Sequence, residues 1–496
     1  MWVFVLVLFK KYDQSQQFLL PLSLDEFIPM DHPARTIDGI VERLDISCIV
    51  SRHSEEGQPA YHPRMMLKVL LYAYGQGITS SREIEDLLKR DTVFMYLAAM
   101  QKPDYRTICL FRTRYLDCLL SLFVQVLRIC DELDMVDLVN VSIDGTKIKA
   151  NASRKKSKDL KQIEKEIKGW LDEADRVDQE EDDLYGGATP FKLPSEMVDR
   201  KTREKKIEEA MKKVRELEDA KKKLEQSGDK MINLTDEDAK MMKNGRLIRP
   251  CYNGQLAVDS KCQVIVAVDL TNVEVDYDQL VPLVEQIEGN LGELPNVITA
   301  DSGYATYNNL EYLPGKEIVG LIPDQMLKIE EAGKKKYFSK NKFTYDTPND
   351  QYTCPGGKML THQNRQKMKD GSFVELYMAK ESDCKECTLK AKCTKAAKRI
   401  ISRNPREHLF EEMRKRLKSP LGKALYKLRK ITVEPVNGNI KYNKGFDEFS
   451  LRGKLKAKIE LILMSIAHNI DKIHDRLTSL KVLILQPSVL DAKASF

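Results

Sequence analysis

Val139-Asn140-Val141-Ser142-Ile143-Asp144-Gly145 is the stretch that decides the fold class. Valine and isoleucine at every second position predict a strand that is buried on at least one face and ends at Asp144. Comparable short apolar runs follow at 255–259, 263–269, 296–301 and 317–323. Three strands come first and helices then alternate with strands, so we predict an α/β class with a mixed sheet and helices on its faces.

The composition is that of a globular protein, with 496 residues, of which 42% are hydrophobic and 31% charged. No apolar run approaches the roughly 18 residues of a membrane helix. The apolar segment Trp2–Phe9 is short and lacks the flanks of a signal peptide, which favours a stray or packed terminus. We therefore expect a cytoplasmic protein without membrane association. The ten cysteines should be thiols or metal ligands, with Cys109, Cys118 and Cys130 packed on apolar helix faces.

The pattern from Leu20 to Asp134 is helical. One helix begins at Pro63, and a second reopens after Gly75-Gln76-Gly77 with Thr79 or Ser80 as its cap. A helix with a short turn and another helix suits a DNA-binding unit of helix-turn-helix type, and an ordinary helical bundle with solvated arginines explains the pattern equally well. The candidate DNA-binding residues here are Arg64, Arg82, Arg106 and Arg112.

The composition shifts sharply from about residue 153 to 244, where Lys and Glu dominate and apolar residues are sparse. Two long helices joined by a loop at 178–194 predict an antiparallel helical hairpin. A basic arm that grips DNA is the alternative. The mixed charge signs favour a solvated helix pair.

Asp144 and Asp301 each end a predicted buried strand, at the edge of the sheet where ligands bind in open α/β folds. Two carboxylates brought together repel one another, and a divalent cation relieves that repulsion. Hard oxygen ligands suit Mg²⁺ or Mn²⁺. Asp259 and Asp269 also end strands, and we interpret them as turn residues.

A third carboxylate stands among cations further along the chain. Glu434 can complete a metal-binding triad, while Arg429 and Lys441 can hold phosphate oxygens. The block 411–460 has 14 Lys and Arg against 6 Asp and Glu, a local charge of +8 that exceeds the +6 of the whole chain. A basic block beside candidate metal carboxylates is typical of a phosphodiester substrate, although a solvated basic helix has the same composition.

Four cysteines follow in a stretch that we expect to be irregular, namely Cys354, Cys384, Cys387 and Cys393. The C-x₂-C pair with two further thiols can make a tetrahedral structural Zn²⁺ site. The remaining spacings are not those of a standard zinc ribbon, so reduced packed thiols are the alternative.

Together these features resemble the DDE transposases of bacterial insertion sequences, whose catalytic core is ribonuclease H-like. The resemblance is carried by Val141-Ser142-Ile143-Asp144-Gly145-Thr146, by Ala300-Asp301-Ser302-Gly303-Tyr304 and by the signature group Tyr426, Arg429, Glu434 and Lys441. Six residues separate Glu434 from Lys441, as is usual. Four separate Arg429 from Glu434 where the common form has three, so that Lys430 stands at the common distance.

The resemblance covers nearly all of the chain up to about Asp475. Further stretches that look like the family are Phe9–Gln14, Tyr61–Leu71, Leu234–Ala239 and Tyr252–Gln255. Since Phe9–Gln14 looks like the usual start of members of this family, residues 1–8 are expected to be an upstream extension.

The resemblance implies a transposase that binds the terminal inverted repeats of its element, cuts at the ends and joins them to target DNA. Asp144, Asp301 and Glu434 would hold two Mg²⁺ or Mn²⁺ ions for an in-line displacement. Arg429 and Lys441 would contact DNA and position a phosphate or a flipped base, with Tyr426 in the same catalytic group. A homodimer on DNA is expected. An inactive DNA-binding descendant, or a ribonuclease H-like nuclease without joining activity, is the alternative.

These observations divide the chain into five parts. We expect a helical DNA-binding domain (1–134), a ribonuclease H-like core (135–151, 250–325 and 405–480), a charged helical insertion (152–249), a Cys-containing insertion (326–404) and a tail (481–496).

Overall fold

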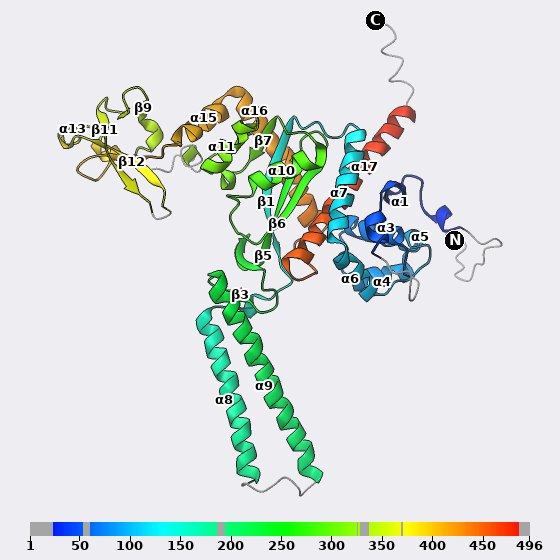
Figure 1. The fold of residues 1–496 in the computed structure, drawn as a ribbon. Helices are drawn as coiled ribbons and strands as arrows, with labels where there is room; N and C mark the ends of the chain where they lie inside the picture. The colour runs from blue at the N-terminus through cyan, green and yellow to red at the C-terminus, as the bar shows by residue number, and fades with distance from the viewer. Residues whose placement is uncertain are drawn as a thin grey trace, which may run out of the picture.

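The computed structural model describes residues 23–52, 60–185, 194–324, 326–327, 337–368 and 371–485. The expectations for residues 1–8 and for Phe9–Gln14 lie outside the described residues, as does most of the expected tail. Helical segments at the N-terminal end, a central mixed sheet, a projecting helical hairpin and a small lateral sheet can be followed in Figure 1.

The N-terminal region is helical, as the sequence predicts. Its helices are α1 (Pro33–Arg43), α2 (Ser47–Val50), α3 (Pro63–Gly75), α4 (Ser81–Arg90), α5 (Thr92–Leu97), α6 (Tyr105–Arg114) and α7 (Leu116–Glu132). Proline stands in the first turn of α1 and of α3, where no backbone N–H is needed. Ser80 caps α4 by accepting a hydrogen bond from the Glu83 amide at 3.4 Å.

The central sheet is mixed. Its strands are β1 (Asn140–Lys149), β4 (Lys240–Asn244), β5 (Leu247–Asp259), β6 (Ile265–Thr271), β7 (Val297–Ala300) and β8 (Val319–Leu321). The order is β4-β5-β1-β7-β8, and β6 pairs with β5. β5 runs antiparallel to β1 and β6, whereas β1, β7 and β8 are parallel. The sequence did not predict β4, because its residues, Lys-Met-Met-Lys-Asn, carry little β signal.

Helices cover the sheet on both sides. They are α10 (Leu280–Leu291), α11 (Tyr307–Gly315), α15 (Glu407–Lys418), α16 (Pro420–Gly438), which continues as a π-helical turn (Asn439–Asn443), and α17 (Lys454–Leu485). In Figure 1, α17 lies between the sheet and the N-terminal helices. The buried Asn469 of α17 bonds to the backbone N–H and C=O of Ile265 in β6, both at 2.9 Å, which fixes the helix against the edge of the sheet. Within the described residues, no helix is long and apolar enough to span a bilayer.

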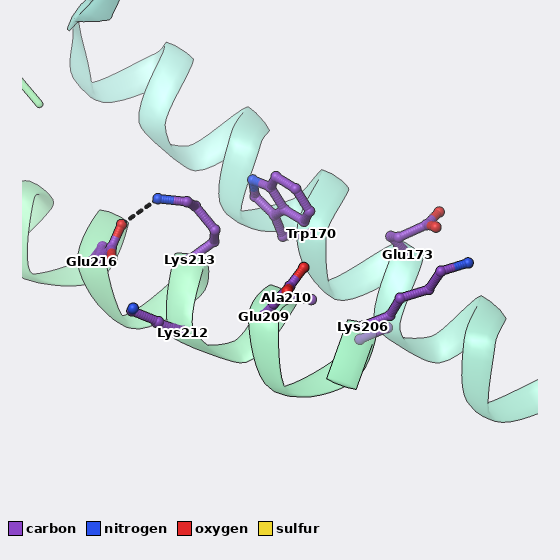
Figure 2. Close-up of a pocket in the computed structure, with 9 residues that line it drawn as sticks. Trp170, Glu173, Lys206, Glu209, Ala210, Lys212, Lys213 and Glu216 are labelled. Atoms are coloured by element: carbon purple, nitrogen blue, oxygen red, sulfur yellow. Dashed lines mark hydrogen bonds and ion pairs between the residues drawn. The ribbon is translucent and has the colours of Figure 1, made fainter. Parts of the chain in front are cut away.

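The predicted charged hairpin consists of α8 (Leu160–Tyr185) and α9 (Pro194–Ser227), which project from the body of the molecule (Figure 1). A two-stranded ladder of β2 (Ser157–Lys158) and β3 (Ile232–Asn233) closes its base. Trp170 of α8 lies over α9 at a hollow of about 440 Å³, among lysines and glutamates that include Lys206 and Glu216 (Figure 2). This hollow contains none of the predicted site residues.

The Cys-containing insertion is more regular than predicted. It forms a five-stranded antiparallel sheet of β9 (Thr344–Asp346), β10 (Gln351–Thr353), β11 (Met359–Lys367), β12 (Phe373–Ala379) and β13 (Ile400–Arg403), with short helices α13 (Glu381–Lys385) and α14 (Lys390–Cys393). Phe343, Tyr352, Leu360, Tyr377 and Ile401 form its own small core. The expectation of an irregular stretch was wrong, because the strands are short and their apolar residues are few.

The expectation that every cysteine is a thiol or a metal ligand was wrong for one pair. Cys48 of α2 and Cys118 of α7 form a disulfide, with Cα atoms 5.7 Å apart. The packing of α2 on α7 brings these side chains together across 70 residues of chain. The sequence pattern of either helix alone contains no sign of that pairing.

Candidate active site

Asp144 lies in the middle of β1. The sequence predicts a strand that ends at Asp144, but β1 continues to Lys149, because residues 141–149 pair with β5 without interruption. Ile143 pairs with Ala300 at the end of β7, so the next residue on each strand is an aspartate, Asp144 or Asp301. The register of two parallel neighbours therefore brings the first two candidate carboxylates to adjacent positions.

Asp301 caps a short 3-10 helix (Ser302–Tyr304) directly after β7. Its Oδ1 accepts a hydrogen bond from the Gly303 amide at 2.7 Å, which fixes the orientation of the carboxylate. A Cβ at Gly303 would stand 2.9 Å from Asp301 Oδ1 and 3.1 Å from Asp276 Oδ2. Glycine is therefore needed at this position, where two acidic side chains approach the backbone.

Glu434 reaches the site from α16 through Arg429. The Arg429 guanidinium donates to Asp144 Oδ1 at 2.6 Å and to Glu434 Oε1 at 2.9 Å. Asn437, one turn further along the same helix, donates to Asp144 Oδ2 at 3.0 Å. The third candidate carboxylate thus lies on the same side of the sheet as Asp144, with a cation between them.

The other members of the signature group line the same region. Lys441 donates from Nζ to the Lys147 carbonyl at 2.7 Å, so it lies beside β1. Burial lowers the pKa of Lys441, and Cys251 and Asp144 partly oppose that shift. Burial raises the pKa of the Tyr426 hydroxyl, with the positive charge of Arg429 opposing it.

Burial shifts the pKa of the Asp144 carboxyl upwards. Burial raises its pKa to about 6, Arg429 acts in the opposite direction, and the negative charges of Asp301 and Asp276 raise it further. The side chain is 18% exposed. One guanidinium therefore does not fully offset the effects of burial and of the two neighbouring carboxylates.

These residues suit a hard divalent cation. Carboxylate oxygens are the ligands that Mg²⁺ prefers, and the uncompensated charge around Asp144 is what such an ion would neutralise. Across the described part of the chain, no group of three or more His, Cys, Asp or Glu side chains is arranged to hold an ion, and Arg429 stands between two of the candidate ligands. Binding an ion through both Asp144 and Glu434 therefore requires the Arg429 guanidinium to shift.

Asp276 is a fourth carboxylate that the sequence reasoning missed. It lies in the loop between β6 and α10, and its Oδ1 accepts hydrogen bonds from the side-chain amides of Asn253 and Gln255, both at 2.7 Å. Gln255 in turn accepts a hydrogen bond from the hydroxyl of the buried Tyr304. β6 runs in the same direction as β1, so its carboxyl end faces the same edge of the sheet, and that topology is the signal by which Asp276 could have been found.

The predicted DNA-binding arginines differ in accessibility. Arg82 and Arg106 are exposed. Arg64 donates to the Val41 and Leu44 carbonyls at the end of α1, where it stabilises the helix terminus. Arg112 is 2% exposed and forms an ion pair with the fully buried Glu460 at 3.3 Å. Its predicted contact with DNA does not agree with this burial, because the amphipathic face that contains Arg112 is the inner one.

Two of the four candidate zinc ligands lie close together. Cys354 Sγ and Cys387 Sγ stand 3.6 and 3.7 Å from the position that a Cβ would take on Gly356. Burial raises the pKa of Cys393, and Arg399 opposes the shift, while the thiols of Cys384, Cys354 and Cys387 act in the same direction as burial. The four thiols are therefore neighbours, although no group of three or more His, Cys, Asp or Glu side chains among the described residues is arranged to hold a metal ion.

Two protein-family models match the chain. One, described as a transposase DDE domain, matches residues 353–474, which include Glu434 and Lys441. The other, described as a transposase domain (DUF772), matches residues 22–114 in the N-terminal helical region. No curated protein and no solved structure matches the chain.

Proposed function

Because the chain belongs to the DDE transposases of bacterial insertion sequences, we propose that it binds the terminal inverted repeats of its element and catalyses metal-dependent strand cleavage and strand transfer. The observation that carries this proposal is the convergence of Asp144, Asp301 and Glu434, which come from two neighbouring strands and a distant helix. DNA is the partner, and a homodimer would present two active sites to the two ends of the element.

We further propose that the core is ribonuclease H-like. The strand order β6-β5-β1-β7-β8, in which only β5 runs against the others, supports this assignment, as does the position of the first aspartate on the central strand β1. The helical insertion follows the central strand β1 and adds β4 to the sheet beside β5, whereas the Cys-containing insertion follows β8 at the other end of the strand order.

Asp144, Asp301 and Glu434 would hold the divalent ions. When bound, such ions supply Lewis-acid stabilisation of the oxygens that attack and leave a phosphodiester in an in-line displacement. Arg429, once it is displaced from the carboxylates, would hold a phosphate oxygen with its planar fork. Lys441 would add a point charge beside β1, and the lowered pKa of its ammonium reflects a site that excludes water.

The hollow next to Asp301 is where we propose that a DNA strand lies. It has a volume of about 690 Å³ and lies between the core and the Cys-containing insertion. Its walls include Ser302 and Tyr307 from the core and three cations that are each held in an ion pair, Lys340 with Glu407, Arg414 with Asp324 and Arg406 with Glu311. Tyr307 stacks edge to face on Phe410, with ring centroids 4.8 Å apart, which keeps this side of the hollow rigid.

The test is a gel assay with Mg²⁺ and duplexes taken from both flanks of the coding sequence. Joined product supports the proposal, nicked product alone indicates a nuclease without joining activity, and a mobility shift without cutting indicates an inactive DNA-binding descendant. Asp144→Ala, Asp301→Ala and Glu434→Ala should each abolish cleavage and retain DNA binding. Asp278→Ala removes an exposed carboxylate nearby and should cleave normally.

We retain structural Zn²⁺ as a separate proposal for Cys354, Cys384, Cys387 and Cys393. The proximity of these thiols supports it. Metal analysis of the purified chain should find about one zinc per molecule for a Cys₄ site. Loss of that zinc in Cys387→Ser, but not in Cys109→Ser, would identify the ligand set.

A further inference from the structure

The outer face of α6 presents an unusual set of side chains to solvent. Arg106, Leu110 and Arg114 are exposed at intervals of four residues, so they form one stripe along the helix. Leu110 is 66% exposed, a large apolar side chain between two cations. The opposite face, with Ile108, Phe111 and Arg112, is buried. Packing therefore determines which face of α6 remains available to a partner.

The charged residues of α6 itself have one sign. α6 contains three arginines and no acidic residue. The guanidiniums of Arg82 and Arg106 lie 5.1 and 5.7 Å from the centre of the Tyr105 ring, and Arg106 Nε donates to the Tyr105 hydroxyl at 3.2 Å. This stacking holds two cations side by side at the first turns of α4 and α6.

Asp104, the exposed N-cap of α6, is an acidic neighbour of Arg106 but forms no ion pair with it. In the described part of the chain, Arg82, Arg106 and Arg114 make no ion pair with a carboxylate. Arg90 at the end of α4 differs, since its Nε lies 2.6 Å from Asp86. A face with unpaired arginines and a single exposed leucine suits a polyanion better than a protein surface, which would need a larger apolar area.

We propose that the outer face of α6 reads base pairs in the major groove of the element's terminal DNA. This inference rests on the proposed function and specifies the surface that recognises the ends. Arg106 and Arg114 are eight residues apart, or about 12 Å along the helix, which spans roughly three to four base pairs. The guanidinium group of each arginine can bind the major-groove edge of a guanine. Leu110, which lies between the two arginines, can contact the methyl group of a thymine. Arg82 contacts the neighbouring phosphate.

The test uses the full-length protein and a library of random duplexes of about 30 base pairs, long enough for two half-sites a turn apart. Wild-type protein selects a sequence motif, and its affinity is then measured for the selected duplex and for a scrambled one. Arg106→Lys keeps the charge and removes the fork, so it should lower affinity for the selected duplex about 10-fold while leaving the scrambled duplex unaffected. Leu110→Ala should relax the motif at one position.

Arg90→Ala is the matched control, because it removes the same residue type from a neighbouring, paired position and should leave both affinities unchanged. If Arg106→Lys and Leu110→Ala both select the wild-type motif with wild-type affinity, α6 is not the reading helix, and the proposed transposase function stands. If the wild-type protein selects no motif, end recognition itself fails, and this inference fails with it.

Discussion

Arg429 joins Asp144 to Glu434 by donating a hydrogen bond to each carboxylate. Asp144 lies 285 residues before Arg429 in the chain. The two aspartates are brought together by strand register, whereas Glu434 is oriented by this guanidinium. A side chain of the signature group therefore places a positive charge between two of the candidate carboxylates.

Arg429→Ala should lower the free energy of unfolding by about 2 kcal/mol when measured by urea denaturation without divalent ions, because it leaves a mostly buried Asp144 without its cation. Lys430→Ala is the control, since Lys430 is the exposed neighbour at the spacing that is common in the family. It should change stability by less than about 0.5 kcal/mol. An equal loss of unfolding free energy in both variants would show that the ion pairs of Arg429 make no specific contribution to stability.

Asp276→Asn should reduce strand cleavage by about 10- to 100-fold and leave DNA affinity intact, because Asp276 orients Asn253 and Gln255 beside Asp144. Cleavage rates on end-containing duplexes provide the measurement. Asp278→Asn alters an exposed carboxylate two residues away and should have wild-type rates. Equal rates for Asp276→Asn and wild type would restrict the candidate site to Asp144, Asp301 and Glu434.

Arg112→Ala should destabilise the fold by about 3 to 5 kcal/mol, since it leaves the fully buried Glu460 without a cation. Arg112 also donates to the Tyr74 hydroxyl, the Thr79 carbonyl and the Ser81 hydroxyl at 2.7 to 2.9 Å. Equilibrium unfolding of this variant beside Arg90→Ala measures the effect. A stable Arg112→Ala protein with weakened DNA binding would restore the original assignment of Arg112 to the DNA interface.

His468 should make stability depend on pH in the acidic range. It is buried in α17, and burial lowers its pKa from 6.5 to about 4, with the hydrogen bond to the Gln263 carbonyl opposing the shift. The unfolded chain binds the proton more readily, so this stabilisation is present above about pH 6.5 and is lost as the pH falls towards 4. The full effect is on the order of 3 kcal/mol. His468→Gln should flatten the stability profile between these pH values, and an unchanged slope would contradict the prediction.

Much of the active site was accessible from local patterns. Asp144, Asp301 and the group around Glu434 could be identified because apolar strand patterns, a basic block and a spaced signature are properties of contiguous residues, although β1 does not end at Asp144 as predicted. The sequence reasoning missed Asp276 because this residue does not end a strand. It follows β6 by five residues, in the loop before α10. The Cys48–Cys118 bond escaped for a similar reason, since it depends on how two helices pack.

The amino-acid sequence by itself determined the helical N-terminal region, the main strands of the central sheet, the family resemblance and three of the candidate carboxylates, because periodicity and spacing are properties of short segments. Only the tertiary structure decided which side chains meet. Helix packing turned Arg112 inwards and Arg106 outwards on one helix, and strand register set Asp144 beside Asp301. Such choices depend on contacts between residues that are distant in the chain, and no local pattern contains them.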